Sequence, residues 1–306
     1  MTHRLEKTLR SMLDRVVAQV DIEGLGKLYR GKVRDNFIRD DGTRIIVTSD
    51  RVSAFDHVIG TIPAKGQVLS TLASWWFDRT SDVAPNHLVK VLDPAAHLVH
   101  EAEPIMVEMV MRGYLTGTTG TSIWTFYERG ERLYCGHALP DGMKRHQRLP
   151  QPLLTPTTKA EKGQHDEPIS REQAIESGVV SAEEFDEAAA LAMALFERGT
   201  AICADRGIIL VDTKYEFGRL PDGRMAVIDE IHTPDSSRFW RAESYDDAVA
   251  SGSDPEPLDK DYVRQYLKSV GFAGEGQPPE LPEEVRVEAA LRYVRAYEAL
   301  TGGHFE

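Results

Sequence analysis

The clearest pattern in the chain is an alternation of apolar and polar positions on both sides of a Pro-Asp-Gly turn. Residues 208–230 therefore predict two β-strands joined in a hairpin. With Asp222 and Gly223 at the centre of a two-residue turn, Glu216 is expected directly opposite Asp229. A turn one residue longer would put Ile228 or Glu230 opposite Glu216, because a slip of one residue changes the face of a strand.

The same alternation gives this hairpin one strongly polar face. Asp212 and Lys214 share the face of Glu216, because side chains two residues apart point the same way. Facing carboxylates destabilise a ladder, so a cation is expected between Glu216 and Asp229, and oxygen-only ligands suit Mg²⁺. The pattern predicts a metal–nucleotide site. The alternative, a surface hairpin with its charges in water, fits the apolar character of the strands less well.

Elsewhere the periodicity predicts a β-rich first third and a mixed remainder, hence an α+β protein of two lobes, residues 1–112 and 113–306. The expected strands are 27–30, 32–38, 44–48 and 105–111. The expected helices are 5–20, 69–79, 122–129, a short one opened by a capping box at 170–173, 181–205, and 258–300 with a break at 274–282. Residues 149–168, rich in Pro, Thr and Lys, are expected to form an ordered loop or a mobile flap.

Composition limits the classes of function. The net charge of −13 over 306 residues argues against a general nucleic-acid-binding role. Cys135 and Cys203 form neither a disulfide framework nor a zinc pattern. The first 20 residues resemble no signal peptide, and no apolar run approaches the ~20 residues that a spanning helix needs. A cytoplasmic protein without a membrane partner is expected.

Two segments before residue 60 could bind a ligand. Residues 26–33 nearly spell a P-loop, but Val33 replaces the hydroxyl residue that binds Mg²⁺. A hairpin carrying Gly31 and Lys32 can still cover a nucleotide, although a solvent-exposed basic hairpin explains it equally well. Residues 48–56 place polar groups at a strand end, which suits either ligand contact or a capped turn.

Two later segments are rich in groups that bind anions. Arg112 ends a strand before a Gly/Thr loop that reaches Thr118, and forked donors with exposed backbone N–H groups suit a phosphate or carboxylate. The alternative is a flexible connector. Residues 229–238 are expected to extend the second hairpin strand toward Arg238. His232 within them is a possible base, but a lone histidine is more often structural.

Together these motifs resemble the SAICAR synthetase family, in the family's order and over about residues 27 to 240. The matching segments are Gly31-Lys32-Val33-Arg34-Asp35, Ser49-Asp50-Arg51-Val52-Ser53-Ala54-Phe55-Asp56, Arg112-Gly113-Tyr114-Leu115-Thr116-Gly117-Thr118, Asp212-Thr213-Lys214-Tyr215-Glu216-Phe217-Gly218 and the stretch from Asp229 to Arg238. The resemblance implies an ATP-grasp-like cleft between a smaller N-terminal and a larger C-terminal lobe. It also implies an ATP-dependent ligase of de novo purine biosynthesis. That enzyme joins L-aspartate to carboxyaminoimidazole ribonucleotide (CAIR) through an acyl phosphate, giving SAICAR, ADP and phosphate.

The resemblance also implies roles for individual residues. The hairpin that covers ATP would carry Gly31, Lys32 and Arg34, and Lys214 would face the nucleotide. Glu216 and Asp229 would ligate Mg²⁺. Lys214 and Asp212 are the expected catalytic residues, and the expected substrate-binding residues are Ser53, Asp56, Arg112, Thr118, Asp235, Ser237 and Arg238. Of these, Asp56 would meet the aminoimidazole, whereas Arg112, Thr118 and Arg238 would hold the ribonucleotide phosphate.

Several alternatives stay open. A kinase-like phosphotransferase would share the lysine and the acidic ligands, but the sequence has no His-Arg-Asp catalytic loop and no Asp-Phe-Gly motif. A non-catalytic nucleotide-binding module is the second alternative. Residues 151–168 are expected to act as a lid that orders when substrates bind, with Lys159 or Lys162 near a carboxylate or phosphate, or else to be a solvated linker. The sequence is compatible with a monomer or a homo-oligomer.

Overall fold

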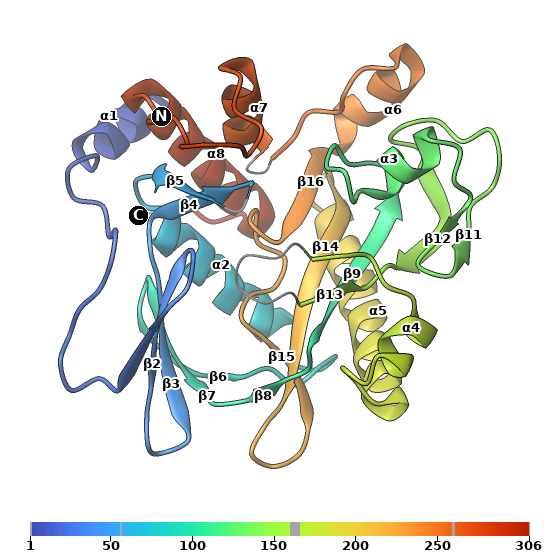
Figure 1. Ribbon diagram of the computed structural model, residues 1–306. Helices are drawn as coiled ribbons and strands as arrows, with labels where there is room; N and C mark the ends of the chain where they lie inside the picture. Colours follow the sequence, from blue (N-terminus) through green and yellow to red (C-terminus); the bar gives the residue numbers. More distant parts are fainter. Residues whose placement is uncertain (1, 56, 160–165, 259–260, 306) are drawn as a thin grey trace.

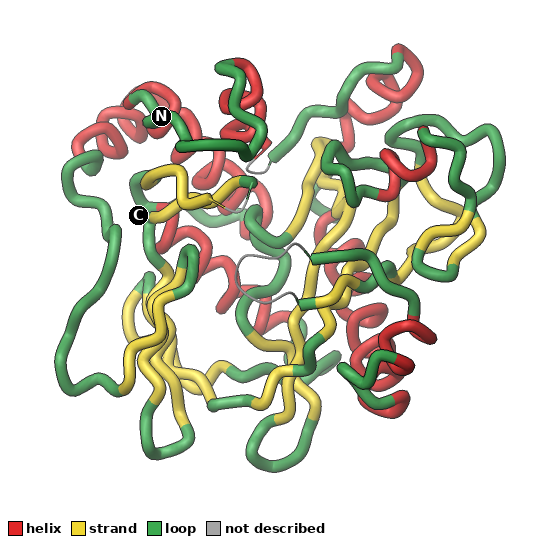
Figure 2. Tube along the Cα trace, viewed as in Figure 1, coloured by secondary structure: helices red, strands yellow, loops and turns green. Residues whose placement is uncertain are grey.

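The computed structural model describes residues 2–55, 57–159, 166–258 and 261–305. Its strands gather in two principal sheets with helices packed around them (Figure 1 and Figure 2). The first sheet comes from residues 27–100, is antiparallel and follows the order β1-β2-β3-β7-β6. Its strands are β1 (Lys27–Arg30), β2 (Arg34–Ile38), β3 (Thr43–Thr48), β6 (Leu88–Asp93) and β7 (Ala96–His100).

The second sheet follows the order β12-β9-β14-β15, with β13 paired to β9 and with β8 and β16 paired to β14. Its strands are β8 (Glu103–Pro104), β9 (Val107–Tyr114), β12 (Arg148–Leu154), β13 (Thr157–Thr158), β14 (Ile208–Arg219), β15 (Met225–Ile228) and β16 (Ser237–Arg241). Two small hairpins complete the described strands: β4 (Arg51–Ala54) with β5 (His57–Thr61), and β10 (Leu133–Tyr134) with β11 (His137–Ala138).

Strand β14 is the central strand of the second sheet. Its first part pairs with β9 and β16, and its last part pairs with β15. Residues 212–215 pair with β9, residues 208–213 with β16, and residues 216–219 with β15. The chain leaves β15 after Ile228 and returns to β14 only at Ser237. Residues 229–236 therefore form a loop beside the middle of β14, where the N–H of Lys214 donates to the carbonyl of Ser236 at 3.0 Å. The expectation that residues 229–238 extend the second hairpin strand is wrong.

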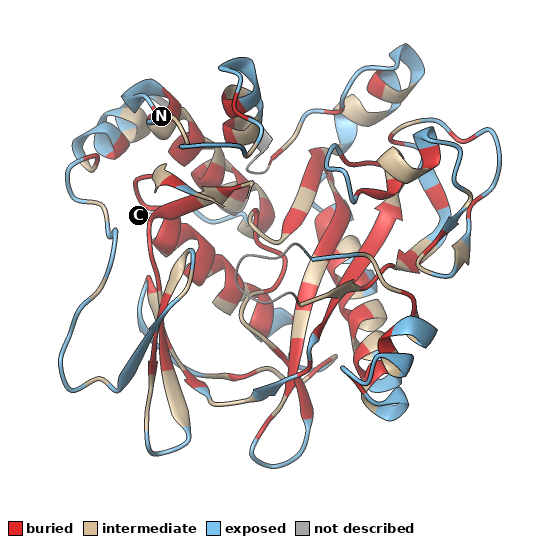
Figure 3. Cartoon of the chain, in the orientation of Figure 1, coloured by how far each residue is buried: buried red, intermediate tan, exposed pale blue. Residues whose placement is uncertain are grey.

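The helices bury their apolar faces in two clusters. One cluster joins α2, α5, β9 and β14, and the other joins α1, α2 and α8. Figure 3 shows how much of α2 is buried between them. The helices are α1 (Thr2–Ser11), α2 (Lys65–Arg79), α3 (Ile123–Glu128), α4 (Arg171–Glu176), α5 (Ala182–Ala204), α6 (Ala242–Ser251), α7 (Asp261–Ser269) and α8 (Glu283–Thr301). Among the described residues, no helix is long and apolar enough to cross a membrane.

Local rules predicted several elements correctly and missed others. The capping box at Ser170 opens α4, and a second box at Ser181 opens α5. The first helix ends at Ser11 instead of residue 20. The expected loop at 149–168 is wrong in part, because β12 and β13 lie within it. Two prolines made β12 hard to predict, and its pairing with β9 is interrupted where they occur, between Arg148 and Leu153.

The predicted border between the lobes, residues 112 and 113, lies inside β9. Helix α8, near the C-terminus, packs against α1 and α2 of the N-terminal part. The chain therefore crosses between the two sides of the molecule more than once. The division of the chain into two lobes at residues 112 and 113 stays a prediction.

Candidate active site

The hairpin of β14 and β15 has a register one residue away from the predicted one. Glu216 lies opposite Ile228, so the expected pairing of Glu216 with Asp229 is wrong. The turn is longer than expected: Leu220 donates its N–H to the carbonyl of Arg224 at 2.9 Å. Asp229 then takes a left-handed conformation, with φ of 67°, which ends β15. Both carboxylates nevertheless line one cavity of about 110 Å³.

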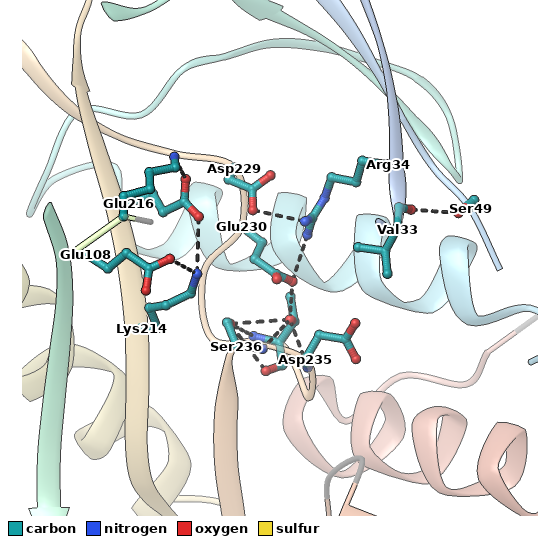
Figure 4. A network of polar contacts seen from close by, with 12 residues as sticks. Val33, Arg34, Ser49, Glu108, Lys214, Glu216, Asp229, Glu230, Asp235 and Ser236 are labelled. Atoms are coloured by element: carbon teal, nitrogen blue, oxygen red, sulfur yellow. Dashed lines mark hydrogen bonds and ion pairs between the residues drawn. The ribbon is translucent and has the colours of Figure 1, made fainter. Parts of the chain in front are cut away.

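Lys214 lies at the centre of a cluster of charges. Its ammonium group binds the carboxylate of Glu108 and lies 3.2 Å from Oε1 of Glu216 (Figure 4). Lys159 binds the other oxygen of Glu216 at 2.5 Å. Burial opposes the charge of Lys214, but Glu216 and Glu108 outweigh it and raise its pKa. Lys214 therefore stays a cation at neutral pH, so it stabilises negative charge and does not act as a base.

Burial alone would raise the pKa of Glu216, but Lys214 and Lys159 outweigh it and lower that pKa well below the usual range. The pKa of Asp229 moves the other way. Burial raises it, Arg34 opposes the rise, and the charge of Glu216 adds to it. The pKa values of the two carboxylates in this cavity are thus shifted in opposite directions.

Arg34 connects the first sheet to the loop that follows β15. From β2, its guanidinium lies 2.9 Å from Asp229 and 3.0 Å from Glu230 (Figure 4). Burial opposes its charge, but the two carboxylates outweigh it and keep the pKa of Arg34 above its ordinary value. An arginine expected to cover a nucleotide thus also fixes the position of a predicted metal ligand.

The loop of residues 229–236 is anchored to the protein interior by His232. This residue has φ of 48°, is fully buried, and hydrogen-bonds through Nε2 to the hydroxyl of Tyr215. Its ring packs edge-on against Trp76, with centroids 4.6 Å apart. Burial lowers the pKa of His232 to about 3, so the ring is neutral. The structural role is the one that the structure favours for His232.

Two arginines share one carboxylate at the other end of the same face of β14. Asp212 accepts from Arg238 at 2.7 Å and 2.9 Å and from Arg112 at 3.4 Å. Arg112 also donates to the hydroxyl of Thr155 at 2.8 Å. Asp212 and both arginines line a cavity of about 170 Å³ that also includes Lys214. The carboxylate offsets the repulsion between the two guanidinium groups and holds them in place.

The remaining predicted residues are distributed unevenly around these cavities. Asp235 and Ser237 line the cavity of the two arginines. Thr118 and Arg238 line an adjoining cavity of about 230 Å³. Gly31 lies between β1 and β2, where its N–H donates to the carbonyl of Arg34, and Lys32 is the next residue of the same turn. Ser53 lies in β4 and lines neither of these two cavities. Asp56, Lys162 and His165 lie outside the described residues.

Comparisons with known proteins match this chain to one family. The family model of SAICAR synthetase matches residues 27–281. The chain belongs to the SAICAR synthetase family. Several relatives carry the name phosphoribosylaminoimidazole-succinocarboxamide synthase, and three of them illustrate the similarity. The one from Azobacteroides pseudotrichonymphae is 47% identical over 91% of this chain and 85% of its own. The one from Legionella pneumophila strain Paris is 43% identical over 92% and 89%. The chloroplastic one from Arabidopsis thaliana is 42% identical over 99% and 73%.

Solved structures of SAICAR synthetases confirm the predicted α+β fold. The Saccharomyces cerevisiae SAICAR synthase, complexed with SAICAR, has a TM-score of 0.80 and 31% identity, covering 95% of this chain and 99% of its own. A type-2 SAICAR synthetase in complex with ADP has a TM-score of 0.70 and 24% identity, covering 92% and 100%, and supports the fold alone. The predicted family, fold class and enzyme class are confirmed.

In this SAICAR synthetase family member, the donor set at Glu216 and Asp229 fits Mg²⁺. Among the described residues, no group of three or more His, Cys, Asp or Glu side chains could hold a metal on its own. Mg²⁺ often takes one or two carboxylates and completes its shell with waters and substrate phosphates. Two oxygen donors in one cavity are therefore enough for an ion that arrives with a nucleotide.

Some residues of the site were not found from the sequence. Glu108 binds Lys214 and accepts from Thr157 at 2.8 Å, and a single charge within an apolar strand was its available signal. Arg264 of α7 lines the cavity of the two arginines and also the adjoining cavity that contains Thr118. In the sequence, this residue had no signal beyond helical periodicity. Lys65 of α2 is fully buried and binds Asp235 across a sequence separation of 170 residues, which no local pattern reveals.

Proposed function

We propose that this chain is the ATP-dependent ligase that joins L-aspartate to CAIR and releases SAICAR, ADP and phosphate. One observation carries the proposal. Alternate residues of a single strand face, Asp212, Lys214 and Glu216, connect an arginine pair at one end to a lysine–carboxylate cluster at the other. An anion clamp beside a metal–nucleotide site suits a phosphorylated substrate that reacts with ATP.

The arginine end would bind the ribonucleotide. Arg112 and Arg238 present forked donors into one cavity, and Thr118 adds a hydroxyl beside Arg238. Planar guanidinium groups bind phosphate with two parallel hydrogen bonds. Asp212, which the sequence suggested as catalytic, is assigned a positioning role because its carboxylate already binds both arginines.

The carboxylate end would bind ATP. Glu216 and Asp229 would hold Mg²⁺, which would neutralise phosphate charge when bound. Lys214 projects a permanent positive charge between this end and the arginine cavity. The β1–β2 turn, with Gly31, Lys32 and Arg34, would cover the nucleotide. Arg34 would exchange part of its contact with Asp229 for phosphate oxygens.

The chemistry follows from the weakness of a carboxylate as an acyl donor. The CAIR carboxylate attacks the terminal phosphorus of ATP, and ADP leaves, which gives an acyl phosphate. The amine of L-aspartate then attacks the acyl carbon, the C–N bond forms, phosphate leaves and the amine loses a proton. Lys214 stabilises the charge that develops on transferred oxygens, and the arginines hold the ribonucleotide in line.

Measurement of ADP release tests the proposal. The purified chain with Mg–ATP should release ADP only when both CAIR and L-aspartate are present, and a chelator of Mg²⁺ should stop the release. Equal ADP release without aspartate would support a kinase or ATPase instead. No ADP release under any combination would contradict an enzyme of this class.

Further parts of the proposal concern the molecule as a whole. We place the smaller lobe around the first sheet and the larger lobe around the second, with the nucleotide between them. The small-molecule partners are ATP, CAIR and L-aspartate. A cytoplasmic location, the lid role of residues 151–168 and the choice between monomer and homo-oligomer stay predictions.

A further inference from the structure

His146 lies in the wall of the adjoining cavity of about 230 Å³, beside the Gly/Thr loop that follows β9. It is buried and takes φ of 65°, a left-handed backbone conformation that few residues other than glycine adopt. Its N–H donates to the carbonyl of Leu115 at 2.8 Å, and the hydroxyl of Tyr245 donates to its own carbonyl at 3.0 Å. Its ring packs edge-on against Trp240, with centroids 5.3 Å apart. Three separate segments therefore hold His146 in a strained conformation.

Both ring nitrogens of His146 have a partner that lines the same cavity. Nε2 lies 2.7 Å from Oδ1 of Asp254, and Nδ1 lies 2.9 Å from the hydroxyl oxygen of Thr116. An ionised carboxylate can only accept a hydrogen bond, so Nε2 carries a hydrogen. In the neutral ring Nδ1 is then the acceptor, and the hydroxyl of Thr116 donates to it. The protonation state of His146 therefore decides where the hydrogen of this hydroxyl points.

The adjoining cavity has an excess of positive charge. Its described lining contains four cations and a single carboxylate, in a chain whose net charge is −13. The cations are Arg145, Arg238, Arg264 and Lys268, and the carboxylate is that of Asp254. Burial lowers the pKa of His146, Asp254 opposes this effect, and the charges of Arg145 and Arg238 add to it. The ring of His146 is therefore neutral at pH 7 in the ligand-free protein.

We propose that His146 is a positioning residue that directs the Thr116 hydroxyl toward the phosphate of the ribonucleotide and takes up a proton when that phosphate binds. The inference rests on the proposed function, which assigns this phosphate to Arg112, Thr118 and Arg238. The proton comes from water and binds Nδ1, and the new N–H donates to the hydroxyl oxygen of Thr116. The hydrogen of that hydroxyl then leaves Nδ1 and is donated to a phosphate oxygen. His146 therefore acts through Thr116.

The charge of the ligand drives this proton uptake. A phosphate dianion in the cavity favours the charged form of a nearby imidazole, which is the opposite of the effect of the arginines. Because the protonated ring binds the dianion more tightly than the neutral ring, the affinity for CAIR should increase as the pH falls from 8.5 to 6.5. One linked proton changes the affinity by at most about tenfold per pH unit. Below about pH 6 the phosphate itself gains a proton, so the comparison stays above that value.

Calorimetric titration of the full chain with CAIR, without ATP or L-aspartate, tests the inference. In buffers of different ionisation enthalpy, the change of the binding heat with the buffer gives the number of protons taken up. At pH 7 the wild type should take up more of a proton than His146→Asn, since asparagine tolerates the left-handed conformation but does not titrate. The affinity of His146→Asn should also vary less with pH. Thr116→Val keeps the shape of the side chain and should raise the Kd for CAIR about tenfold, or 1.4 kcal/mol.

Asp254→Asn keeps the inference testable if His146→Asn folds poorly. It removes the negative charge that opposes the arginines, so His146 should take up less of a proton when CAIR binds. Tyr245→Phe is the matched control, because it removes a hydrogen bond to the backbone of His146 and leaves the ring in place. It should lower the melting temperature but keep the proton uptake. His137→Asn removes a histidine of β11 that bonds to the carbonyl of Leu154 at 2.7 Å, and it should leave the proton uptake unchanged.

The outcomes are distinct. A wild type that neither binds CAIR nor releases ADP would overturn the proposed function and this inference together. A wild type that binds CAIR with this proton uptake but releases no ADP would overturn the proposed function and support the inference. If the wild type took up no more protons than His146→Asn, or if Tyr245→Phe lost the uptake equally, the inference alone would be overturned. Uptake that is lost in His146→Asn and kept in Tyr245→Phe would support it, as would less than additive effects of His146→Asn and Thr116→Val on the Kd for CAIR.

Discussion

The ammonium group of Lys159 lies 2.5 Å from Oε2 of Glu216, the carboxylate that we assign to Mg²⁺. Lys214 lies 3.2 Å from the other oxygen, so both oxygens of Glu216 face a lysine. Two facing carboxylates without partners would repel each other, so the removal of either charge would stabilise the protein without ligands. The two lysines change that expectation for Glu216.

Glu216→Gln should therefore destabilise the ligand-free protein. The pKa of Glu216 in the folded chain lies below its ordinary value of 4.5, so its ionised form stabilises the fold. That contribution is present above the ordinary pKa and is lost as the pH falls toward the lowered one. The expected loss at pH 7 is about 1.5–3 kcal/mol, the range for hydrogen bonds to charged groups. Chemical denaturation at pH 7 and pH 3 measures it, and turnover should nearly vanish. An unchanged or increased free energy of unfolding would contradict the pairing with Lys159 and Lys214.

Asp229→Asn should have the opposite sign. The pKa of Asp229 lies above its ordinary value of 3.8, because burial and the nearby charge of Glu216 outweigh Arg34. Its ionised form is therefore less favourable in the folded chain, and stability falls as the pH rises through this range. Asp229→Asn should leave the ligand-free protein at least as stable as the wild type at pH 7, while turnover nearly vanishes. Thermal unfolding from pH 4 to pH 8 compares Asp229→Asn with Glu216→Gln. A clear loss of stability in Asp229→Asn at pH 7 would contradict this expectation.

The sequence predicted the alternation that places Asp212, Lys214 and Glu216 on one face, because side-chain direction in a strand follows a fixed period. It did not predict the register, because the turn at Asp222 and Gly223 is longer than the most favoured hairpin turn. The left-handed conformation of Asp229 brings the two carboxylates to one cavity in spite of that register.

Long-range contacts explain most of what the sequence left out. Lys65 meets Asp235, and Arg34 meets Asp229, across separations of 170 and 195 residues. No period or cap links such positions, so only the packing of α2 and the first sheet against the second sheet reveals them. Short-range signals worked where the physics is local, as at the capping box of Ser170, which opens α4, and in the helical spacing that predicted α5.

Arg112→Ala should weaken the ribonucleotide selectively. Arg112 donates to Thr155 and lies beside Asp212, so its guanidinium is held at the cavity. Truncation of one side of a buried charge pair costs roughly 2–5 kcal/mol, and this should appear in kcat/KM for CAIR. The KM for ATP should hardly change. Arg219→Ala is the control, because Arg219 ends β14, the strand that carries Asp212, but pairs with Glu187, away from the arginine cavity. A higher KM for ATP with a normal KM for CAIR would reverse the assignment of the two anion sites.

Gly199→Ala should displace the loop that carries Asp229 and Asp235. Gly199 lies on α5, and a Cβ there would approach Cε1 of His232 to 2.4 Å. Replacing glycine by alanine within a helix normally stabilises it by up to about 1 kcal/mol. Here the added methyl group must move the His232 ring, which is confined by Tyr215 and Trp76. Overpacking of this kind costs about 1–3 kcal/mol.

The kinetic consequence of Gly199→Ala separates it from simple loss of stability. Because His232 anchors the loop, a shift of about 1 Å at Asp229 should lower kcat by up to about 100-fold, even at temperatures where the variant is folded. Glu197→Ala, on the exposed side of the same helix, should leave the melting temperature and kcat unchanged. Adding His232→Ala to Gly199→Ala should relieve the overlap and recover part of the stability, but not the turnover, since the anchor is then absent. Thermal unfolding and kcat of the four proteins decide the matter. Normal turnover in Gly199→Ala would show that the position of the loop does not depend on His232.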